Sequence, residues 1–224
     1  PKRLRGKVLE VTIDMSGSLN SAVKACFPNA HRVIDRFHVQ QLAFDAVQEI
    51  RIKYRWEALE QENLEYEQAK RSAVKWEPTR LPNGDTAKQL LARSRYLLFK
   101  HPRLWTREQQ QRAELLFTHY PLIHKSYQLS LRLGEVYRHC KCKEEAFKKL
   151  ALWYNDVEEA GLLSFKTVAR TIRTHYLGIL NFFNNRATNA AAESFNAKIK
   201  SFRNALRGVR DVEFFLYRLT KLYA

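Results

Sequence analysis

The chain has 224 residues, of which 45% are hydrophobic, and a formal net charge of +16. That hydrophobic share supports a folded core and excludes a disordered tail, while no apolar run approaches the roughly 18 residues of a membrane span. With 7 Gly and 6 Pro, the chain has about half the average share of turn residues, which favours long helices over an all-β sandwich.

The start of the chain predicts a strand, a helix and a second strand. Residues 8–13 are mostly β-branched or apolar and end at Asp14, which is typical of a strand. A short helix is expected over residues 19–27, and residues 31–34 predict the second strand. A unit of this length predicts two parallel strands with a right-handed crossover.

The rest of the chain predicts helices. Residues 38–71 predict one long charged helix or a helical pair, and residues 78–85 form the clearest loop. Gly208 separates the last two helices. The other predicted helices cover residues 86–99, 107–119, 122–139, 143–160, 165–183, 190–207 and 211–223.

These elements predict an α/β fold in which helices dominate. Two parallel strands alone make a poor core, because parallel sheets are normally larger and buried on both faces. We therefore expect further strands from upstream of residue 1 or from another chain. The chain begins with Pro1 instead of Met, which indicates that it is cut from a longer protein.

The basic residues are clustered. Four of the first seven residues are Lys or Arg, and residues 198–210 contain no acid. Such clusters favour a polyanionic partner, most simply nucleic acid, although a merely soluble basic protein stays an alternative. The basic residues of the second cluster are Lys198, Lys200, Arg203, Arg207 and Arg210.

The three cysteines, Cys26, Cys140 and Cys142, cannot all pair within one chain. Reduced thiols of a cytoplasmic protein are the simplest interpretation. The basic start of the chain has no apolar stretch after it, so it does not predict a signal peptide. His139 lies beside Cys140, but no second ligand pair stands at zinc-finger spacing.

Asp14 ends a predicted parallel strand and precedes a Gly/Ser turn. In open α/β sheets this edge is where ligands bind. An aspartate at this place also often caps the next helix. The residues favour neither interpretation over the other.

Glu193 begins the polar face of the helix predicted over residues 190–207. An acid followed by amides and cations on one face suits a metal ligand next to phosphate-binding groups. A solvated charged face is the common alternative. The polar face carries Glu193, Asn196, Lys200, Asn204 and Arg207, and the apolar face carries Phe195, Ile199, Phe202 and Leu206.

Asp35 and His38 lie at the junction of the second strand and the long helix. An acid and a histidine three residues apart at such a junction brace a site by hydrogen bonding. The alternative is a structural helix cap and a buried histidine.

Four segments in this order resemble the DDE transposases of bacterial insertion sequences, specifically the ISL3 group. They are Val11–Ser16, Phe27–Ala30 with Val33–Val39, the helical stretch Tyr96–Tyr127 with Trp105–Glu108 inside it, and Thr188–Lys200. The resemblance spans nearly the whole chain. Any one of the segments alone would be a weak signal, and their combined order is the specific one.

The resemblance implies a ribonuclease H-like catalytic domain in which three acids bind two divalent ions, Mg²⁺ or Mn²⁺. By position, Asp14 corresponds to the second catalytic aspartate and Glu193 to the catalytic glutamate, both as metal ligands. Asp35 and His38 correspond to an acid-x-x-His signature that supports the active site.

The resemblance also implies a division of the chain. Residues 1–39 would be the strand–helix–strand part of the catalytic core, 40–183 a helical insertion, and 184–224 the closing helices. The first catalytic aspartate would precede residue 1, so we expect this fragment to be inactive alone.

The expected partner is DNA, both the element ends and the target, in a homo-oligomeric assembly of a cytoplasmic protein that joins the nucleoid when bound to DNA. No membrane partner is expected. DNA contacts are expected from Asn196 and the basic cluster of residues 198–210. The alternative is a non-catalytic helical module that binds nucleic acid or protein and derives from a mobile element, in which Asp14 and Glu193 need not be close.

Overall fold

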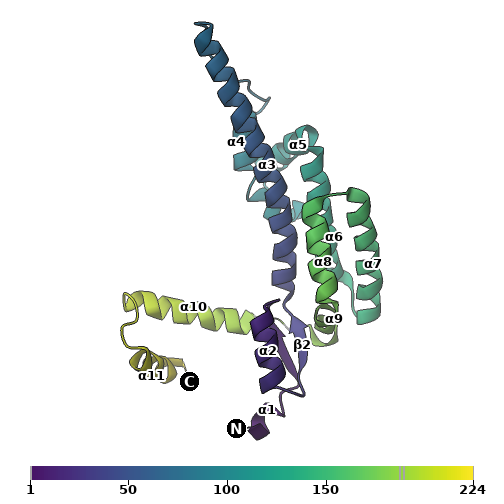
Figure 1. The fold of residues 1–224 in the computed structure, drawn as a ribbon, viewed down its shortest axis with the longest axis vertical. Helices are drawn as coiled ribbons and strands as arrows, with labels where there is room; N and C mark the ends of the chain where they lie inside the picture. The colour runs from purple at the N-terminus through teal and green to yellow at the C-terminus, as the bar shows by residue number, and fades with distance from the viewer. Residues whose placement is uncertain (1, 187, 189, 224) are drawn as a thin grey trace.

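The computed structural model describes residues 2–186, 188 and 190–223, but not the side chains of Lys2, residues 190–193 and Tyr223. In this part of the chain, helices dominate around one small sheet (Figure 1). The elements in chain order are α1 (Lys2–Arg5), β1 (Glu10–Ile13), α2 (Gly17–Cys26), β2 (His31–Ile34), α3 (Arg36–Arg71), α4 (Ala87–Arg93), the 3₁₀ turns η1 (Leu97–Phe99) and η2 (Pro102–Leu104), α5 (Arg107–His119), α6 (Pro121–His139), α7 (Lys143–Ala160), α8 (Leu163–Thr174), α9 (Tyr176–Asn185), α10 (Ala190–Ala205) and α11 (Val212–Tyr223).

The sheet consists of β1 and β2, which pair in parallel from Glu10 opposite His31 to Ile13 opposite Ile34. This confirms the parallel pair predicted from the sequence. Helix α2 connects the strands, and Ile13 and Ile34 are buried at their carboxyl ends. Both strands therefore stop at one edge of the sheet, which fixes where the residues that follow them lie.

Helix α9 packs closely against β2. The Asn181 side-chain amide donates a hydrogen bond of 2.9 Å to the Arg32 carbonyl oxygen. At Gly178, an added Cβ would lie 2.8 Å from Cγ1 of Ile34. This distance is shorter than any ordinary contact, so glycine permits the close approach of helix and strand.

We expect Gly178→Ala to lower the free energy of unfolding by about 1–3 kcal/mol, because the added methyl group overpacks the contact with Ile34. Urea unfolding followed by circular dichroism measures this change. Gly17→Ala is the matched control, since nothing lies within 4 Å of a Cβ at Gly17. Equal stability of the two variants would contradict a packing role for Gly178.

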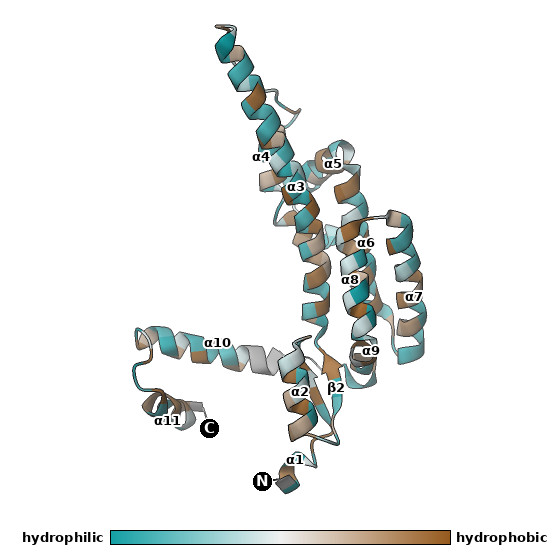
Figure 2. Ribbon diagram, in the orientation of Figure 1, coloured by the Kyte–Doolittle hydropathy of each residue, from teal (hydrophilic) through white to brown (hydrophobic). Residues whose placement is uncertain are grey.

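Helix α3 is one continuous helix of 36 residues, about 54 Å long at 1.5 Å per residue. Of the two arrangements that the sequence allows for residues 38–71, one long helix or a pair of helices, the structure shows the first. Its buried residues all lie between Val39 and Arg51. Its far half projects beyond the bundle and is mainly hydrophilic (Figures 1 and 2). No helix among the described residues combines the length and apolar character needed to cross a membrane.

The first half of α3 packs against α6 and α8, and α7 packs against the same two helices on the other side of the bundle (Figure 1). The bundle core contains the large buried side chains of Trp153, Tyr127 and Phe165. The indole N–H of Trp153 is not left without a partner, because it donates a hydrogen bond of 2.9 Å to the Leu129 carbonyl oxygen. The bundle and the sheet share one hydrophobic core, so the helices support the strand edge.

Two predicted helices differ from the observed ones. The helix predicted over 86–99 ends at Arg93 and continues as a 3₁₀ turn, where the Trp105 indole donates to the Leu97 carbonyl oxygen at 2.8 Å. The helix predicted over 165–183 is two helices that join at His175. Helix α8 packs on α3 and α9 packs on β2, and a change of direction between them lets each reach its own partner.

Candidate functional site

Asp14 and Asp35 occupy equivalent places at the carboxyl edge of the sheet. Each follows the last paired residue of its strand, because Ile13 pairs with Ile34. The Asp35 amide donates a hydrogen bond of 2.9 Å to the Ile13 carbonyl oxygen. The parallel register thus brings two acids from separate strands to one edge, the place where α/β sheets bind ligands.

The Asp14 carboxylate is half-buried and only partly used by the fold. Its Oδ1 accepts a 2.8 Å hydrogen bond from the Ser16 backbone amide. Ser16, and not Asp14, is the N-cap residue of α2. Among the described residues Oδ2 of Asp14 makes no hydrogen bond, so this oxygen is available to a cation.

The Asp35 carboxylate is fully buried and caps helix α3. Its Oδ1 accepts a hydrogen bond of 3.2 Å from the Phe37 backbone amide, and its Oδ2 lies 3.5 Å from Nδ1 of His38. The side chain of His38 is 45% exposed, so the alternative of a buried histidine is wrong. Asp35 therefore combines a structural cap with a contact to an accessible imidazole.

We expect Asp35→Ala to lower the free energy of unfolding by about 1–2 kcal/mol, because α3 loses its N-cap. Asp35→Asn should lower it less, since the amide oxygen still accepts the bond from the Phe37 amide. Chemical denaturation of both variants measures the difference. If alanine and asparagine destabilise the chain equally, Asp35 does not act as a cap.

Glu193 lies in helix α10, and its side chain is outside the described residues. The same holds for Asn189, which precedes this helix. Helix α10 extends away from the bundle (Figure 1). The structure therefore places Asp14 and Asp35 together and leaves the position of the Glu193 carboxylate as a prediction.

The remaining predicted DNA-binding residues lie along α10 and the turn that follows. Phe202 stacks on the buried Phe215 of α11, with 5.4 Å between ring centroids. This contact holds α10 against α11 on its apolar side. The exposed residues are Asn196, Lys198, Lys200, Arg203, Arg207 and Arg210, and we call them the α10 basic surface. Its charges face solvent, as phosphate contacts require.

Comparison with known proteins identifies the family. The family model for the ISL3 group of DDE transposases, described as "Transposase", matches residues 1–219. The chain belongs to this transposase family. It is also 24% identical over 216 residues to the transposase for insertion sequence element IS1001 of Bordetella parapertussis. No solved structure matches this chain.

The ISL3-family chain spans about half of that curated relative: the match covers 95% of the chain and 47% of the relative. The similarity to a transposase therefore extends over nearly all of this chain.

DDE transposases generally use divalent metal ions, and the donor atoms at the strand edge suit them. Carboxylate oxygens are the ligands that Mg²⁺ prefers. Asp14 offers one such oxygen without a hydrogen bond, and Asp35 has a buried Oδ2 without a hydrogen-bond partner. Within the described side chains, no three His, Cys, Asp or Glu residues gather around one point.

Sequence reasoning missed Tyr137, which reaches the neighbourhood of Asp35 from the helical bundle. Tyr137 of α6 is buried, and its burial raises the pKa of its hydroxyl, with the nearby Asp35 carboxylate adding to the effect. Tyr137 belongs to no local motif, so only the packing of α3 against α6 reveals it. The Arg186 guanidinium donates to the Tyr137 and Cys140 carbonyl oxygens at 2.8 and 3.1 Å, which ties the end of α9 to the end of α6.

Proposed function

We propose that the longer protein is a DNA transposase that cuts DNA and transfers strands by two-metal phosphodiester chemistry. Asp14 and Glu193 act as metal ligands in a ribonuclease H-like core, with Asp35 and His38 in support. The observation that carries this proposal is the register of β1 and β2, which places Asp14 and Asp35 at one edge in a chain of a transposase family.

Each group has a separate task in this proposal. Divalent ions, when bound, activate the attacking oxygen and stabilise the leaving oxygen. Asp14 offers its Oδ2 to an ion while its Oδ1 keeps the turn into α2 in place. Asp35 fixes the start of α3 and orients His38 at the edge. The α10 basic surface binds the phosphates on either side of the cleaved bond.

We propose that the longer protein supplies the third acid of the family pattern, together with further strands that pair with the sheet. Residues 40–183 are then a helical insertion between the core segments 1–39 and 184–224. The active assembly on DNA is a homo-oligomer of a cytoplasmic protein.

The test is cleavage and strand transfer by the longer protein on DNA that carries the ends of its element. Activity should require Mg²⁺ or Mn²⁺ and stop with EDTA, and the products should include cut ends with a free 3′-OH that join to target DNA. The 224-residue chain alone should bind DNA without strand transfer. Cleavage by the longer protein in EDTA would refute the metal mechanism.

A further inference from the structure

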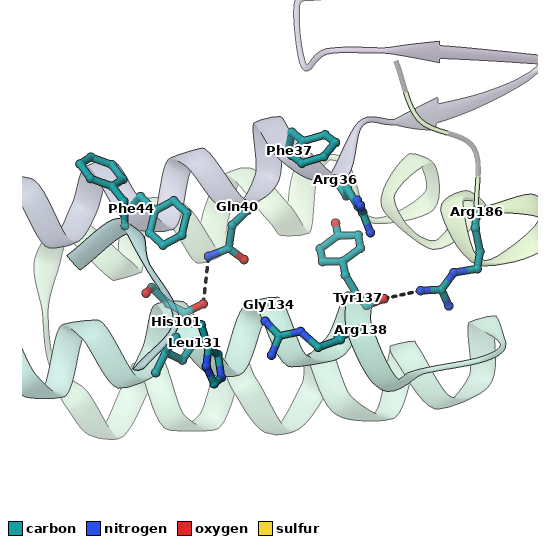
Figure 3. A pocket seen from close by; sticks show the side chains of 12 residues that line it. Arg36, Phe37, Gln40, Phe44, His101, Leu131, Gly134, Tyr137, Arg138 and Arg186 are labelled. Atoms are coloured by element: carbon teal, nitrogen blue, oxygen red, sulfur yellow. Dashed lines mark hydrogen bonds between the residues drawn. The ribbon is translucent and has the colours of Figure 1, made fainter. Parts of the chain in front are cut away.

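A pocket lies between α3 and α6, directly beside the strand edge (Figure 3). Its volume is about 360 Å³, within the range of pockets that hold small molecules. Arg36 follows Asp35 in the chain, and Arg186 ends α9, ahead of the helix with Glu193. The pocket therefore lies beside Asp35, a supporting residue of the proposed site, and beside the end of α9 that precedes the helix with Glu193. We call it the Arg36 pocket.

The lining of the Arg36 pocket is basic. Of the twelve residues drawn in Figure 3, three are arginines, one is a histidine and none is acidic. Two of the arginines have structural partners: Arg186 bonds to the end of α6, and Arg138 pairs with Glu135 at 2.6 Å. Arg36 has neither a hydrogen bond nor an ion pair within the described part of the chain, so it is the arginine that a ligand anion meets.

Aromatic rings stand next to this cation. The Arg36 guanidinium carbon lies 4.9 Å from the centroid of the Phe37 ring, yet Phe37 is still 49% exposed. Phe44 and Phe99 also line the pocket and meet edge to face with 5.4 Å between centroids. An exposed ring beside an unpaired arginine is the pairing that binds single nucleotides, through stacking on the base and attraction to the phosphate.

We propose that the Arg36 pocket binds one unpaired nucleotide of DNA, with its phosphate on Arg36 and its base stacked on Phe37. The position beside Asp35 places this nucleotide next to the bond that the proposed function cleaves, so the assignment of DNA as ligand rests on that function. The enzyme would then hold a DNA end by a base that has left the double helix.

The test uses a DNA duplex with one unpaired 2-aminopurine, mixed with the 224-residue chain in EDTA. Stacking on Phe37 should quench the fluorescence of this base, and Phe37→Ala should abolish the quenching. Arg36→Gln should weaken binding about tenfold, as expected for the loss of one phosphate contact at 0.1 M salt. Circular dichroism checks that both variants fold, and Phe37→Leu replaces Phe37→Ala if needed, because it keeps packing volume but removes the ring.

Arg95 and Tyr96 provide the matched control. They form the same arginine–aromatic pair, with 5.5 Å from guanidinium carbon to ring centroid, and Tyr96 is 68% exposed, but they lie outside the Arg36 pocket. Arg95→Gln and Tyr96→Ala should leave quenching and affinity unchanged. Equal losses in both pairs, or no quenching by the unaltered chain, would overturn the proposal.

The quenching experiment can fail or succeed independently of the proposed function, because it is done in EDTA, where no metal-dependent reaction occurs. Asp14→Asn should bind the unpaired base as the unaltered chain does. If the quenching depends on Phe37 but cleavage by the longer protein does not depend on Asp14, the pocket stands and the catalytic proposal fails. The reverse result removes the pocket and keeps the catalytic proposal.

Discussion

Asp14→Asn or Glu193→Gln in the longer protein should reduce Mg²⁺-dependent DNA cleavage by at least about a thousandfold. Each substitution keeps the size of the side chain and removes the charge that holds a divalent ion. Charge stabilisation by such an ion contributes several kcal/mol to the transition state, and each 1.36 kcal/mol is a factor of ten in rate. Single-turnover cleavage of labelled DNA ends measures the loss.

The control for these two variants is Asp45→Asn. Asp45 is an exposed acid of α3 that accepts a hydrogen bond only from Gln41 among the described residues, so its variant should cleave normally. DNA binding in EDTA should persist in all three variants. Robust cleavage by Glu193→Gln would contradict the assignment of Glu193 as a catalytic ligand.

Reversal of three charges on the α10 basic surface should weaken DNA binding by about a hundredfold or more at 0.1 M salt. The variant is Lys200→Glu with Arg203→Glu and Arg207→Glu, all exposed in the structure. Each lost phosphate contact also removes about 0.9 from the slope of log affinity against log salt, so the slope should flatten by nearly three. Anisotropy titrations at several salt concentrations measure both quantities.

The matched control reverses three exposed charges elsewhere: Lys148→Glu with Lys166→Glu and Arg170→Glu, on α7 and α8. Both triple variants change the net charge equally. The control should keep most of the affinity and slope if contacts on α10 carry the binding. Equal weakening would show that the net charge of +16 attracts DNA without a defined surface.

The sequence predicted the elements whose signals are local. The strand over residues 31–34 is confirmed, and the first strand is shorter than predicted and begins at Glu10. The break at His175 was missed because neither Gly nor Pro marks it; two packing partners, α3 and β2, decide it. Gly178 lies inside the predicted helix, and its role depends on the distance to Ile34, which no sequence pattern reveals.

Some residues of the candidate site could be predicted from local sequence pattern, whereas others became apparent only from the tertiary packing. Strand ends predicted Asp14 and Asp35, because a short apolar run followed by an acid is readable in one segment. The capping bond to the Phe37 amide and the exposure of His38 needed the structure. Tyr137 reaches Asp35 from a helix a hundred residues later in the chain, so only the contact of α3 with α6 brings it to the site.

The most direct test of the central claim is a crystal structure of the longer protein with DNA and Mn²⁺, in which anomalous scattering locates the ions. The account predicts at least one Mn²⁺ bound by both the Asp14 and Glu193 carboxylates, next to the DNA backbone. Carboxylates of Asp14 and Glu193 on opposite sides of the molecule, with the ions held elsewhere, would contradict it and favour a non-catalytic DNA-binding module.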